Sequence, residues 1–301
     1  MIRRIKHLVR KGVDTAIYSP MGVTWLSRLI SNTVAPKAFD FTTHNATEEV
    51  RLQLIEAGIP VSSYSIDVMS FWNYFRSGGY VNSPYGSYRI TVEKALEHYV
   101  AMDLLQLTKD DTYIDVASAN SLAPGIYRKK FGCHVYRQDL LYYPGLNGDL
   151  IGGDAGSMPV PDGFATKMAL HCSFEHFEGD ADTRLILEIG RVLRVGGRAV
   201  IIPLYISPRY SAWTYPMAWL GRRGRPTFDS EALVELERGW RGRFGRVYDV
   251  PHFVSRVVQH LGPLQLKVLS VDPSEIDPPC YLRFVAMFES SVYKNGTEPK
   301  K

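Results

Sequence analysis

The chain has 301 residues, 45% of them hydrophobic and 22% charged, and a formal net charge of +4 at pH 7. This balance is typical of a globular protein that buries a sizeable core, and so mild a charge does not by itself indicate nucleic-acid binding. Cys133, Cys172 and Cys280 have neither CxxC nor metal-ligand spacing, which favours reduced thiols in a cytoplasmic protein and predicts no metal site. No apolar run reaches the roughly 18–20 residues that span a bilayer.

Residues 1–90 are predicted to form an N-terminal helical and aromatic extension. In residues 1–12, basic side chains alternate with apolar ones at helical spacing, so a helix there would have one apolar and one cationic face. Such a helix either makes a peripheral contact with anionic lipid headgroups or packs on its own protein. Asn45-Ala-Thr-Glu48 predicts a capped helix start, with the helix ending near Ala57. The aromatic, glycine-containing stretch 71–88 is predicted either to close over a ligand or to pack into the core.

From residue 91 onward, helical and strand patterns alternate. Apolar residues recur at helical spacing over 91–107, and short apolar runs predict strands at 112–116, 133–138, 165–170 and 198–204. Helices are expected at 122–131 and 180–193, and two final strands at 264–271 and 281–288. Such alternation predicts an open α/β sheet, which binds its ligand beside the carboxyl ends of the strands.

Several motifs lie at the predicted strand ends. The first strand runs into Asp115-Val-Ala-Ser-Ala-Asn-Ser121, and the second ends in Asp139. An acid about 20 residues after the first strand accepts hydrogen bonds from ribose hydroxyls in nucleotide-binding βαβ units. The loop Gly153-Asp154-Ala155 precedes the next strand, which ends in His171-Cys-Ser-Phe-Glu175-His176. Together with Arg191-Val-Leu-Arg-Val-Gly-Gly-Arg198, these motifs resemble the class I S-adenosylmethionine-dependent methyltransferases, of the small-molecule or glycan type and methyltransferase type 11-like.

The resemblance implies a Rossmann-like α/β fold. It predicts a seven-stranded, mostly parallel sheet with an antiparallel last strand and helices on both faces. The methyltransferase domain would cover residues 91–289, with an acceptor-binding cap at 205–263 inserted after the fifth strand. The N-terminal helical extension would precede this domain, and residues 290–301 would form a flexible tail.

The resemblance also implies S-adenosylmethionine as cofactor. Asp139 is expected to accept from the ribose hydroxyls and Asp154 from the adenine amino group, because an ionised carboxylate only accepts. The family usually has glycines where this chain has Ala117, Ala119 and Ser121, and the small side chains are expected to preserve the loop with a slightly displaced cofactor. The full set of implied cofactor-binding residues is Asp115, Ala117, Ser118, Ala119, Ser121, Asp139, Leu140, Asp154, Ala155, His171 and Cys172.

His176, His171 and Glu175 are the candidate catalytic residues. Methyl transfer to a hydroxyl requires that the acceptor proton be removed as the oxygen attacks, and an imidazole near neutral pH is suited to this task. The alternative interpretation is that the glutamate and the histidines only brace the loop.

The segment 205–263 interleaves aromatic residues with arginines and contains no lysine. Arginine suits bidentate contact with phosphate, and aromatic rings stack on sugars or bases. Tyr205, Arg209, Tyr210 and Trp213 are therefore predicted to bind an acceptor, for example a nucleotide- or lipid-linked sugar. The alternative is an arginine-rich helical cap with surface salt bridges.

The sequence thus predicts an S-adenosylmethionine-dependent O-methyltransferase acting on a small or sugar-linked acceptor. The resemblance associates it with surface-polysaccharide or secondary-metabolite biosynthesis and with a cytoplasmic or membrane-peripheral location. A catalytically silent, partner-binding scaffold is the second hypothesis, motivated by the loop at 117–121. A nicotinamide oxidoreductase is disfavoured because no G-x-G-x-x-G follows the first strand, and no nucleic-acid-binding motif is present.

Overall fold

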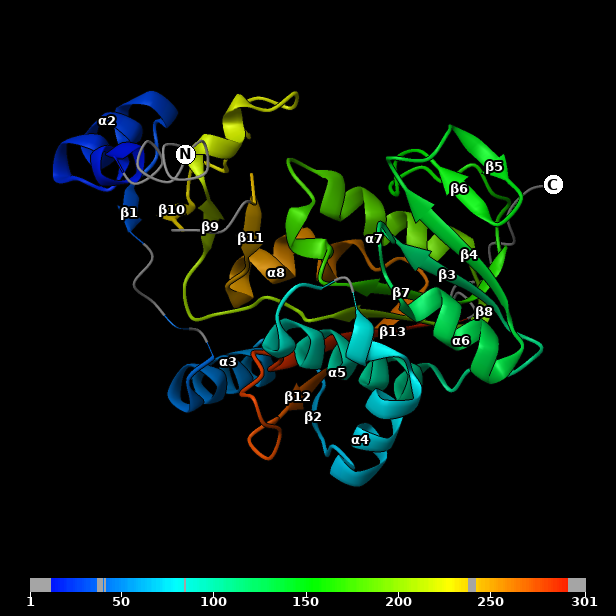
Figure 1. Ribbon diagram of the computed structural model, residues 1–301. Coiled ribbons are helices and arrows are strands. Elements are labelled where there is room, and N and C mark those ends of the chain that lie inside the picture. Colours follow the sequence, from blue (N-terminus) through cyan, green and yellow to red (C-terminus); the bar gives the residue numbers. More distant parts are fainter. Residues whose placement is uncertain (1–11, 37–39, 41, 84, 238–241, 292–301) are drawn as a thin grey trace, which may run out of the picture.

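The computed structural model describes residues 12–36, 40, 42–83, 85–237 and 242–291, and Figure 1 shows two sheets within them. The larger sheet has nine strands. From one edge to the other they are β2 (Val61–Tyr64), β12 (Leu264–Val271), β13 (Phe284–Ser290), β8 (Leu193–Ile202), β7 (Ala165–His171), β3 (Thr112–Val116), β4 (His134–Asp139), β6 (Leu150–Gly152) and β5 (Gly145–Asn147).

The predicted Rossmann-like fold is confirmed by the strand directions. Parallel pairs join β6, β4, β3, β7 and β8, whereas β13 runs antiparallel to both β8 and β12. These seven inner strands are the predicted mostly parallel sheet with its antiparallel last strand. Two short edge strands enlarge it: β2 pairs parallel to β12, and β5 pairs antiparallel to β6.

Helices cover both faces of the large sheet. One face carries α5 (Tyr88–Leu105) and α6 (Ala123–Phe131), with α4 (Val68–Ser77) and the short η1 (Tyr80–Asn82) packed against α5. The opposite face carries α3 (His44–Glu56), α7 (Ala181–Val192) and α8 (Val250–Arg256), with η4 (Val258–His260) after α8. Because strand residues alternate between the two hydrophobic clusters, each face of the sheet is buried under helices.

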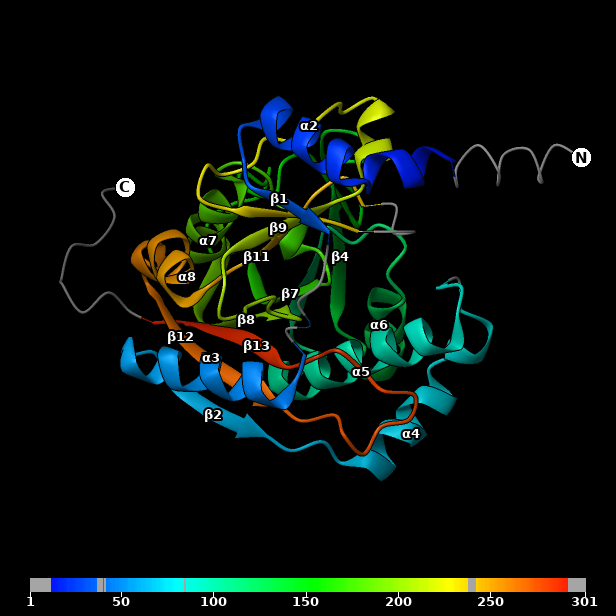
Figure 2. The same ribbon diagram turned by 90° about the vertical axis from the view of Figure 1, so that its left-hand side faces the viewer.

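The smaller sheet is built from two distant parts of the chain. Its order is β1 (Val34–Pro36), β10 (Leu233–Leu236), β9 (Ser211–Thr214) and β11 (Gly245–Val247), and β1 pairs parallel to β10. Helix α2 (Pro20–Ile30) and η3 (Pro216–Leu220) pack beside it, as Figure 2 shows at the top of the molecule. The cap after β8 is therefore a sheet that includes an N-terminal strand, and residues 1–90 contribute to both sheets.

The structure corrects two local predictions in the N-terminal part. Helix α3 begins after Thr43, whose hydroxyl accepts from the Ala46 amide, and not at Asn45. Glu48 does not reach back to cap the helix, because its carboxylate pairs with Arg51. Within the aromatic stretch 71–88, four aromatic side chains are buried in the core: Phe71, Tyr74, Phe75 and Tyr80. The predicted amphipathic segment 1–12, apart from Gly12, and nearly all of the tail 290–301 lie outside the described residues.

The glycine turn before β8's second half is required sterically. Gly196 has φ of 77°, and a Cβ on Gly197 would lie 2.7 Å from the Arg194 carbonyl oxygen and 2.9 Å from that of Thr166. The predicted Gly-Gly turn therefore allows α7 to return closely to the sheet.

Candidate active site

The chain changes direction across the large sheet between β3 and β7. From β3 it proceeds outward through β4 to β6, and it then returns to the other side of β3 as β7 and β8. In open α/β sheets, ligands bind outside the carboxyl ends of the strands at such a switch point. Asp115 lies near the end of β3 and His171 ends β7, so the strand order brings these two predicted residues together.

The loop after β3 adopts the backbone conformation that glycine would normally provide. Ala117 has φ of 51° and Ala119 has φ of 36°, both in the left-handed region. For an L-residue with a Cβ this region costs roughly 1–2 kcal/mol. Cys172, directly after β7, also has a positive φ of 49°. Strained backbone of this kind concentrates at functional sites, and here it marks the facing ends of β3 and β7.

Side chains at the end of β4 hold this loop in place. The Gln138 side-chain oxygen accepts from the Ala117 amide at 3.1 Å, and Asp139 Oδ2 accepts from the Ala119 amide at 2.8 Å. The Arg137 guanidinium donates to the Ala119 carbonyl at 3.0 Å. Asp139 Oδ1 also accepts from the Leu141 amide. Asp139, predicted to bind ribose, therefore holds the loop after β3 through Oδ2 and the chain after β4 through Oδ1, and each oxygen keeps a second lone pair.

The other predicted residues of this region, Ser118, Ser121 and Leu140, differ in their contacts and exposure. Ser118 is buried and its hydroxyl accepts from Arg137, whereas Ser121 Oγ accepts from the Ala123 amide at the start of α6. The Leu140 side chain is 58% exposed. These contacts place Ser118 and Ser121 in the scaffold of the loop and leave Leu140 at its surface.

Asp115 is a buried carboxylate in which only one of the two oxygens has a hydrogen-bond partner among the described residues. Its Oδ1 accepts from the Tyr113 hydroxyl at 2.7 Å, while its buried Oδ2 has no hydrogen-bond partner among the described residues. Burial raises the pKa of Asp115 to about 6, although the hydroxyls of Ser118 and Tyr113 oppose this rise. A buried acceptor left unsatisfied costs about 1–3 kcal/mol, so a ligand that donates to Oδ2 would relieve this cost.

His171 lies beside Asp115 as a neutral imidazole. Its Nε2 is 3.4 Å from Asp115 Oδ1 and 3.3 Å from the hydroxyl of Tyr113. Because the single Tyr113 proton is donated to Asp115, Nε2 must carry the hydrogen, and the lone pair lies on Nδ1. This Nδ1 is buried without a partner in the described part of the chain, and burial lowers the pKa of His171 to about 3. Such a group accepts a hydrogen bond but does not take up a proton near neutral pH.

His176 is partly exposed and has the other tautomer. It lies in η2 (Phe174–His176), its side chain is 44% exposed, and its ring meets Trp213 edge to face at 5.4 Å. Nδ1 lies 2.6 Å from the carbonyl oxygen of Phe244, which can only accept, so Nδ1 donates and Nε2 carries the lone pair. Nε2 is 3.7 Å from Glu175 Oε1.

Glu175 and Cys172 link His176 to a second group of side chains. The Cys172 thiol donates to Glu175 Oε1 at 3.2 Å and lies 3.6 Å from the Tyr205 hydroxyl. Glu175 Oε2 is buried without a partner within the described ranges. Tyr205 stacks on Tyr281 with ring centroids 6.2 Å apart. Burial and the neighbouring Glu175 raise the pKa of the Cys172 thiol, which therefore remains protonated.

Helix α5 contributes charged residues that sequence reasoning missed. Lys94 Nζ lies 2.9 Å from both carboxylate oxygens of Glu97, which is fully buried. Burial raises the pKa of Glu97 to about 8, against the effect of the Lys94 charge. Glu93 accepts from the backbone amides of Tyr281 and Leu282. An amphipathic pattern predicts that such residues face water, but α5 is enclosed between the sheet and α4, so they point into the protein.

The predicted adenine-binding and substrate-binding residues are only partly brought together. Asp154 is 2.6 Å from Arg184 and accepts from the Gly156 amide; partial burial opposes ionisation, but these contacts lower the pKa of Asp154. Tyr205 and Trp213 lie beside Cys172 and His176. Arg209 instead pairs with Glu235 at 3.1 Å. Ala155, next to Asp154, is buried.

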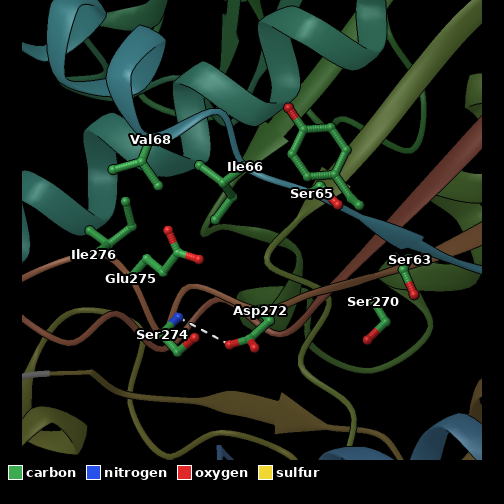
Figure 3. A pocket seen from close by; sticks show the side chains of 10 residues that line it. Ser63, Ser65, Ile66, Val68, Ser270, Asp272, Ser274, Glu275 and Ile276 are labelled. Carbon is green, nitrogen blue, oxygen red and sulfur yellow. Dashed lines mark hydrogen bonds between the residues drawn. The ribbon is translucent and has the colours of Figure 1, made fainter.

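Two cavities lie apart from the residues at the carboxyl ends of β3 and β7. One, of about 520 Å³, is lined by Arg209 and Tyr210, the latter stacked on His252 with ring centroids 3.7 Å apart. The other, of about 280 Å³, lies between β2 and the loop after β12, and Figure 3 shows Asp272 accepting from the Ser274 amide within it. None of the predicted site residues lines this second cavity.

No protein-family model and no curated protein sequence matches the chain. Similar solved structures include a methyltransferase in complex with the Haloferax volcanii Trm112 methyltransferase activator, at 13% identity over 67% of this chain and 92% of that one, with a TM-score of 0.46. The Burkholderia thailandensis 1,6-didemethyltoxoflavin-N1-methyltransferase, with 1,6-didemethyltoxoflavin and S-adenosylhomocysteine, is 11% identical over 86% and 95%, with a TM-score of 0.44. The Streptomyces coelicolor geranyl diphosphate C-methyltransferase, with Mg²⁺, geranyl diphosphate and S-adenosylhomocysteine, is 13% identical over 75% and 100%, with a TM-score of 0.41.

All three are methyltransferases, the class that the motifs of this chain resemble.

Proposed function

We propose that the protein is an S-adenosylmethionine-dependent methyltransferase whose active site lies at the carboxyl ends of β3 and β7. The observation that carries this proposal is the set of buried polar atoms without hydrogen-bond partners. Five such side-chain atoms occur among the described residues, and four of them gather here: Asp115 Oδ2, His171 Nδ1, Ser173 Oγ and Glu175 Oε2. Buried polar groups normally have partners, so a concentration of four without them indicates a place that a ligand completes.

The chemistry of these atoms fits the proposed cofactor. Two are carboxylate oxygens and one is an imidazole lone pair, all of which accept hydrogen bonds, and the serine hydroxyl can accept as well. Such a set favours a cationic, donor-bearing ligand over an anionic one. S-adenosylmethionine carries an ammonium group and a sulfonium centre, from which it supplies a methyl group. Asp115 would accept from the ammonium group, Asp139 from the ribose hydroxyls, and Asp154 with Ala155 would meet the adenine.

His176 is the proposed base for a hydroxyl acceptor. Its tautomer is fixed by the Phe244 carbonyl, its Nε2 carries the lone pair, and Glu175 Oε1 lies 3.7 Å from that nitrogen. The stacked Tyr205 and Tyr281 border the same region, because the Cys172 thiol that donates to Glu175 also contacts both tyrosine hydroxyls. We propose O-methylation of a small or sugar-linked acceptor, with Tyr205 and Trp213 at the acceptor side. A role in surface-polysaccharide or secondary-metabolite biosynthesis is part of this proposal.

Calorimetric titration of the purified chain with S-adenosylmethionine and S-adenosylhomocysteine tests the cofactor site. We expect micromolar binding by the wild type and at least about tenfold weaker binding by Asp115→Asn. Asp149→Asn is the matched control, because Asp149 is 60% exposed and pairs only at the surface with Arg128. Equal affinity in wild type and Asp115→Asn would remove the site assignment. No binding up to millimolar concentration by folded wild type would favour the silent scaffold.

Turnover with a panel of hydroxyl-bearing sugars tests the proposed base. We expect His176→Gln to lower turnover by roughly 10²–10⁴-fold while the affinity for S-adenosylhomocysteine stays within about twofold. His134→Gln is the control, since His134 is exposed at the start of β4, at the edge of the sheet opposite the carboxyl ends of the strands. Wild-type turnover in His176→Gln would leave His176 with a structural role only.

A further inference from the structure

The apolar positions of helix α2 extend well beyond the side that it buries. Its inner face buries Leu26 in the cluster that covers the small sheet, with Val23 and Ile30 packed against it. Its outer face presents Met21 and Trp25, which are 82% and 61% exposed, and Leu29 follows at the same four-residue spacing. A surface helix of a globular protein normally turns polar residues outward. A second apolar stripe on an already packed helix therefore indicates a further apolar contact.

The segment after β9 lies beside α2 and also exposes an apolar side chain. Leu220, at the end of η3, is 80% exposed, whereas the adjacent Trp219 packs into the same cluster as the inner face of α2. Arg225 Nη1 donates to the Leu29 carbonyl at 2.8 Å and so joins the segment to the end of α2. Figures 1 and 2 both show α2 and this yellow segment side by side at one end of the molecule, far from α4.

The charge of this face is uniformly positive. Arg28 lies on the outer side of α2, and Arg222 and Arg223 are exposed directly after Leu220. Neither 20–30 nor 216–228 contains an aspartate or a glutamate. The sequence before α2 adds five more basic residues within positions 1–11, which lie outside the described residues. We call Met21, Trp25, Arg28, Leu29, Leu220, Arg222 and Arg223 the α2 surface.

We propose that the α2 surface docks the protein on an anionic lipid bilayer, with α2 lying in the plane of the interface. Tryptophan with aliphatic side chains, flanked by arginines, is the composition that binds at the headgroup level. Each basic residue near an anionic membrane adds about 1 kcal/mol of attraction. This inference does not depend on the proposed methyltransferase activity. Among the described residues, no helix is long and apolar enough to cross a membrane.

A second copy of the chain fits this surface poorly. In a two-fold symmetric dimer the same patch lies on both sides, so Arg28, Arg222 and Arg223 would face the same arginines of the other copy. Like charges brought together in this way oppose association. Anionic headgroups instead complement the arginines while the acyl chains accept Met21 and Trp25.

Another exposed apolar group provides a matched control. Leu140, Leu141 and Tyr143 are 58%, 79% and 81% exposed after β4, but 140–150 contains no basic residue. If apolar exposure alone caused binding, this group would contribute as much as the α2 surface. The proposal requires that it contribute nothing.

Co-sedimentation of the full chain with vesicles tests the proposal. We expect binding to phosphatidylcholine vesicles that contain phosphatidylglycerol, and at least about tenfold weaker binding to pure phosphatidylcholine. The combined variant Met21→Ser, Trp25→Ser, Leu29→Ser should bind the mixed vesicles at least about tenfold more weakly. The control variant Leu140→Ser, Leu141→Ser, Tyr143→Ser should bind as the wild type does. Arg222→Gln and Arg223→Gln should each weaken binding about fivefold and reduce its salt dependence.

A second measurement uses a variant that keeps the apolar surface. Brominated phosphatidylcholine in the mixed vesicles should quench part of the wild-type tryptophan fluorescence, and Trp25→Phe should remove most of that quenching without loss of binding. Unchanged vesicle binding by the triple serine variant would overturn the proposal, as would failure of the wild type to bind mixed vesicles. Sedimentation of a wild-type dimer that the triple variant abolishes would also overturn it, and would assign the surface to a second copy.

Discussion

Two buried aspartates, Asp182 and Asp115, differ in how far the hydrogen-bonding capacity of their carboxylates is filled. Asp182, at the start of α7, accepts from Arg246, Arg256, the Tyr248 hydroxyl and the Thr183 amide. Asp115, at the end of β3, accepts from the Tyr113 hydroxyl through one oxygen and has no partner for the other in the described part of the chain.

The pKa values of the two carboxyl groups follow from these contacts. Burial opposes ionisation of Asp182, but the bonds from Arg256 and the charge of Arg246 outweigh burial and lower its pKa. Burial dominates at Asp115 and raises its pKa to about 6. The first carboxylate is saturated and joins α7, β11 and α8, whereas the second is left incomplete at the switch point of the sheet. Burial of charge therefore indicates a ligand site only where the hydrogen-bonding capacity is unfilled.

Removing the Asp182 charge should have the largest effect on stability. Asp182→Asn would leave Arg246, which is 1% exposed, without its principal counter-charge. We expect a loss of about 3–5 kcal/mol in the free energy of unfolding, measured by denaturant titration. Asp149→Asn, which breaks the exposed pair with Arg128, is the control and should cost less than about 1 kcal/mol. Similar losses in both variants would mean that the Asp182 cluster is no more than a surface ion pair.

Neutralising Asp115 should change the free energy of unfolding with pH in the opposite direction to neutralising Asp182. Because its pKa is raised in the folded protein from 3.8 to about 6, the folded state binds more protons than the unfolded state in that window, and stability falls as pH rises through it. Asp115→Asn removes this loss. The free energy of unfolding of the variant relative to wild type should therefore rise by on the order of 2–3 kcal/mol from about pH 4 to about pH 7.

The two variants serve as controls for each other. Since the pKa of Asp182 is lowered by folding, its stabilisation is present above the unfolded pKa and is lost as pH falls through the folded value. Asp182→Asn should thus lose most relative stability near neutral pH and least in acid. A flat pH dependence for Asp115→Asn would show that the carboxyl group is solvated in the folded protein.

The course of the large sheet could be predicted because its signals are local. Each inner strand is a short apolar run bounded by turn residues, and the motifs after Asp115 and before Glu175 appear in the order that the fold requires. The cap sheet could not be predicted in the same way. Its strands β1 and β10 have three and four residues, too few for a clear period, and they pair across roughly 200 positions of sequence. Only tertiary packing selects that pairing.

The residue types of the site could be predicted from the sequence, but the different environments of its two histidines could not. The sequence identified both His171 and His176 as candidate bases, because the residues around each histidine do not indicate how deeply its side chain is buried. It is the enclosure of His171 between α5 and the sheet that lowers its pKa, while the Phe244 carbonyl from the cap fixes the tautomer of His176. Glu97 and Lys94 were missed for the same reason: their helix is covered on both sides, which only the assembled fold shows.

The smallest predicted effect concerns the alanines of the loop after β3. Ala117 and Ala119 have left-handed backbone conformations that glycine adopts without penalty, while glycine also costs more conformational entropy on folding. The strain of roughly 1–2 kcal/mol exceeds that entropy term, so Ala117→Gly and Ala119→Gly should each stabilise the protein by about 0.5 kcal/mol in denaturant titration.

The control for these two variants is Ala57→Gly at the end of α3. Ala57 is exposed and has φ of −74°, so glycine relieves no strain there and should slightly destabilise the protein. The loop is already held by Gln138, Asp139 and Arg137, and its shape should survive the substitutions. We therefore expect the affinity for S-adenosylhomocysteine to change by less than about twofold. If both loop variants lost stability as Ala57→Gly does, the positive φ angles of Ala117 and Ala119 would not represent backbone strain. The alanines would then cost this loop no stability relative to glycines.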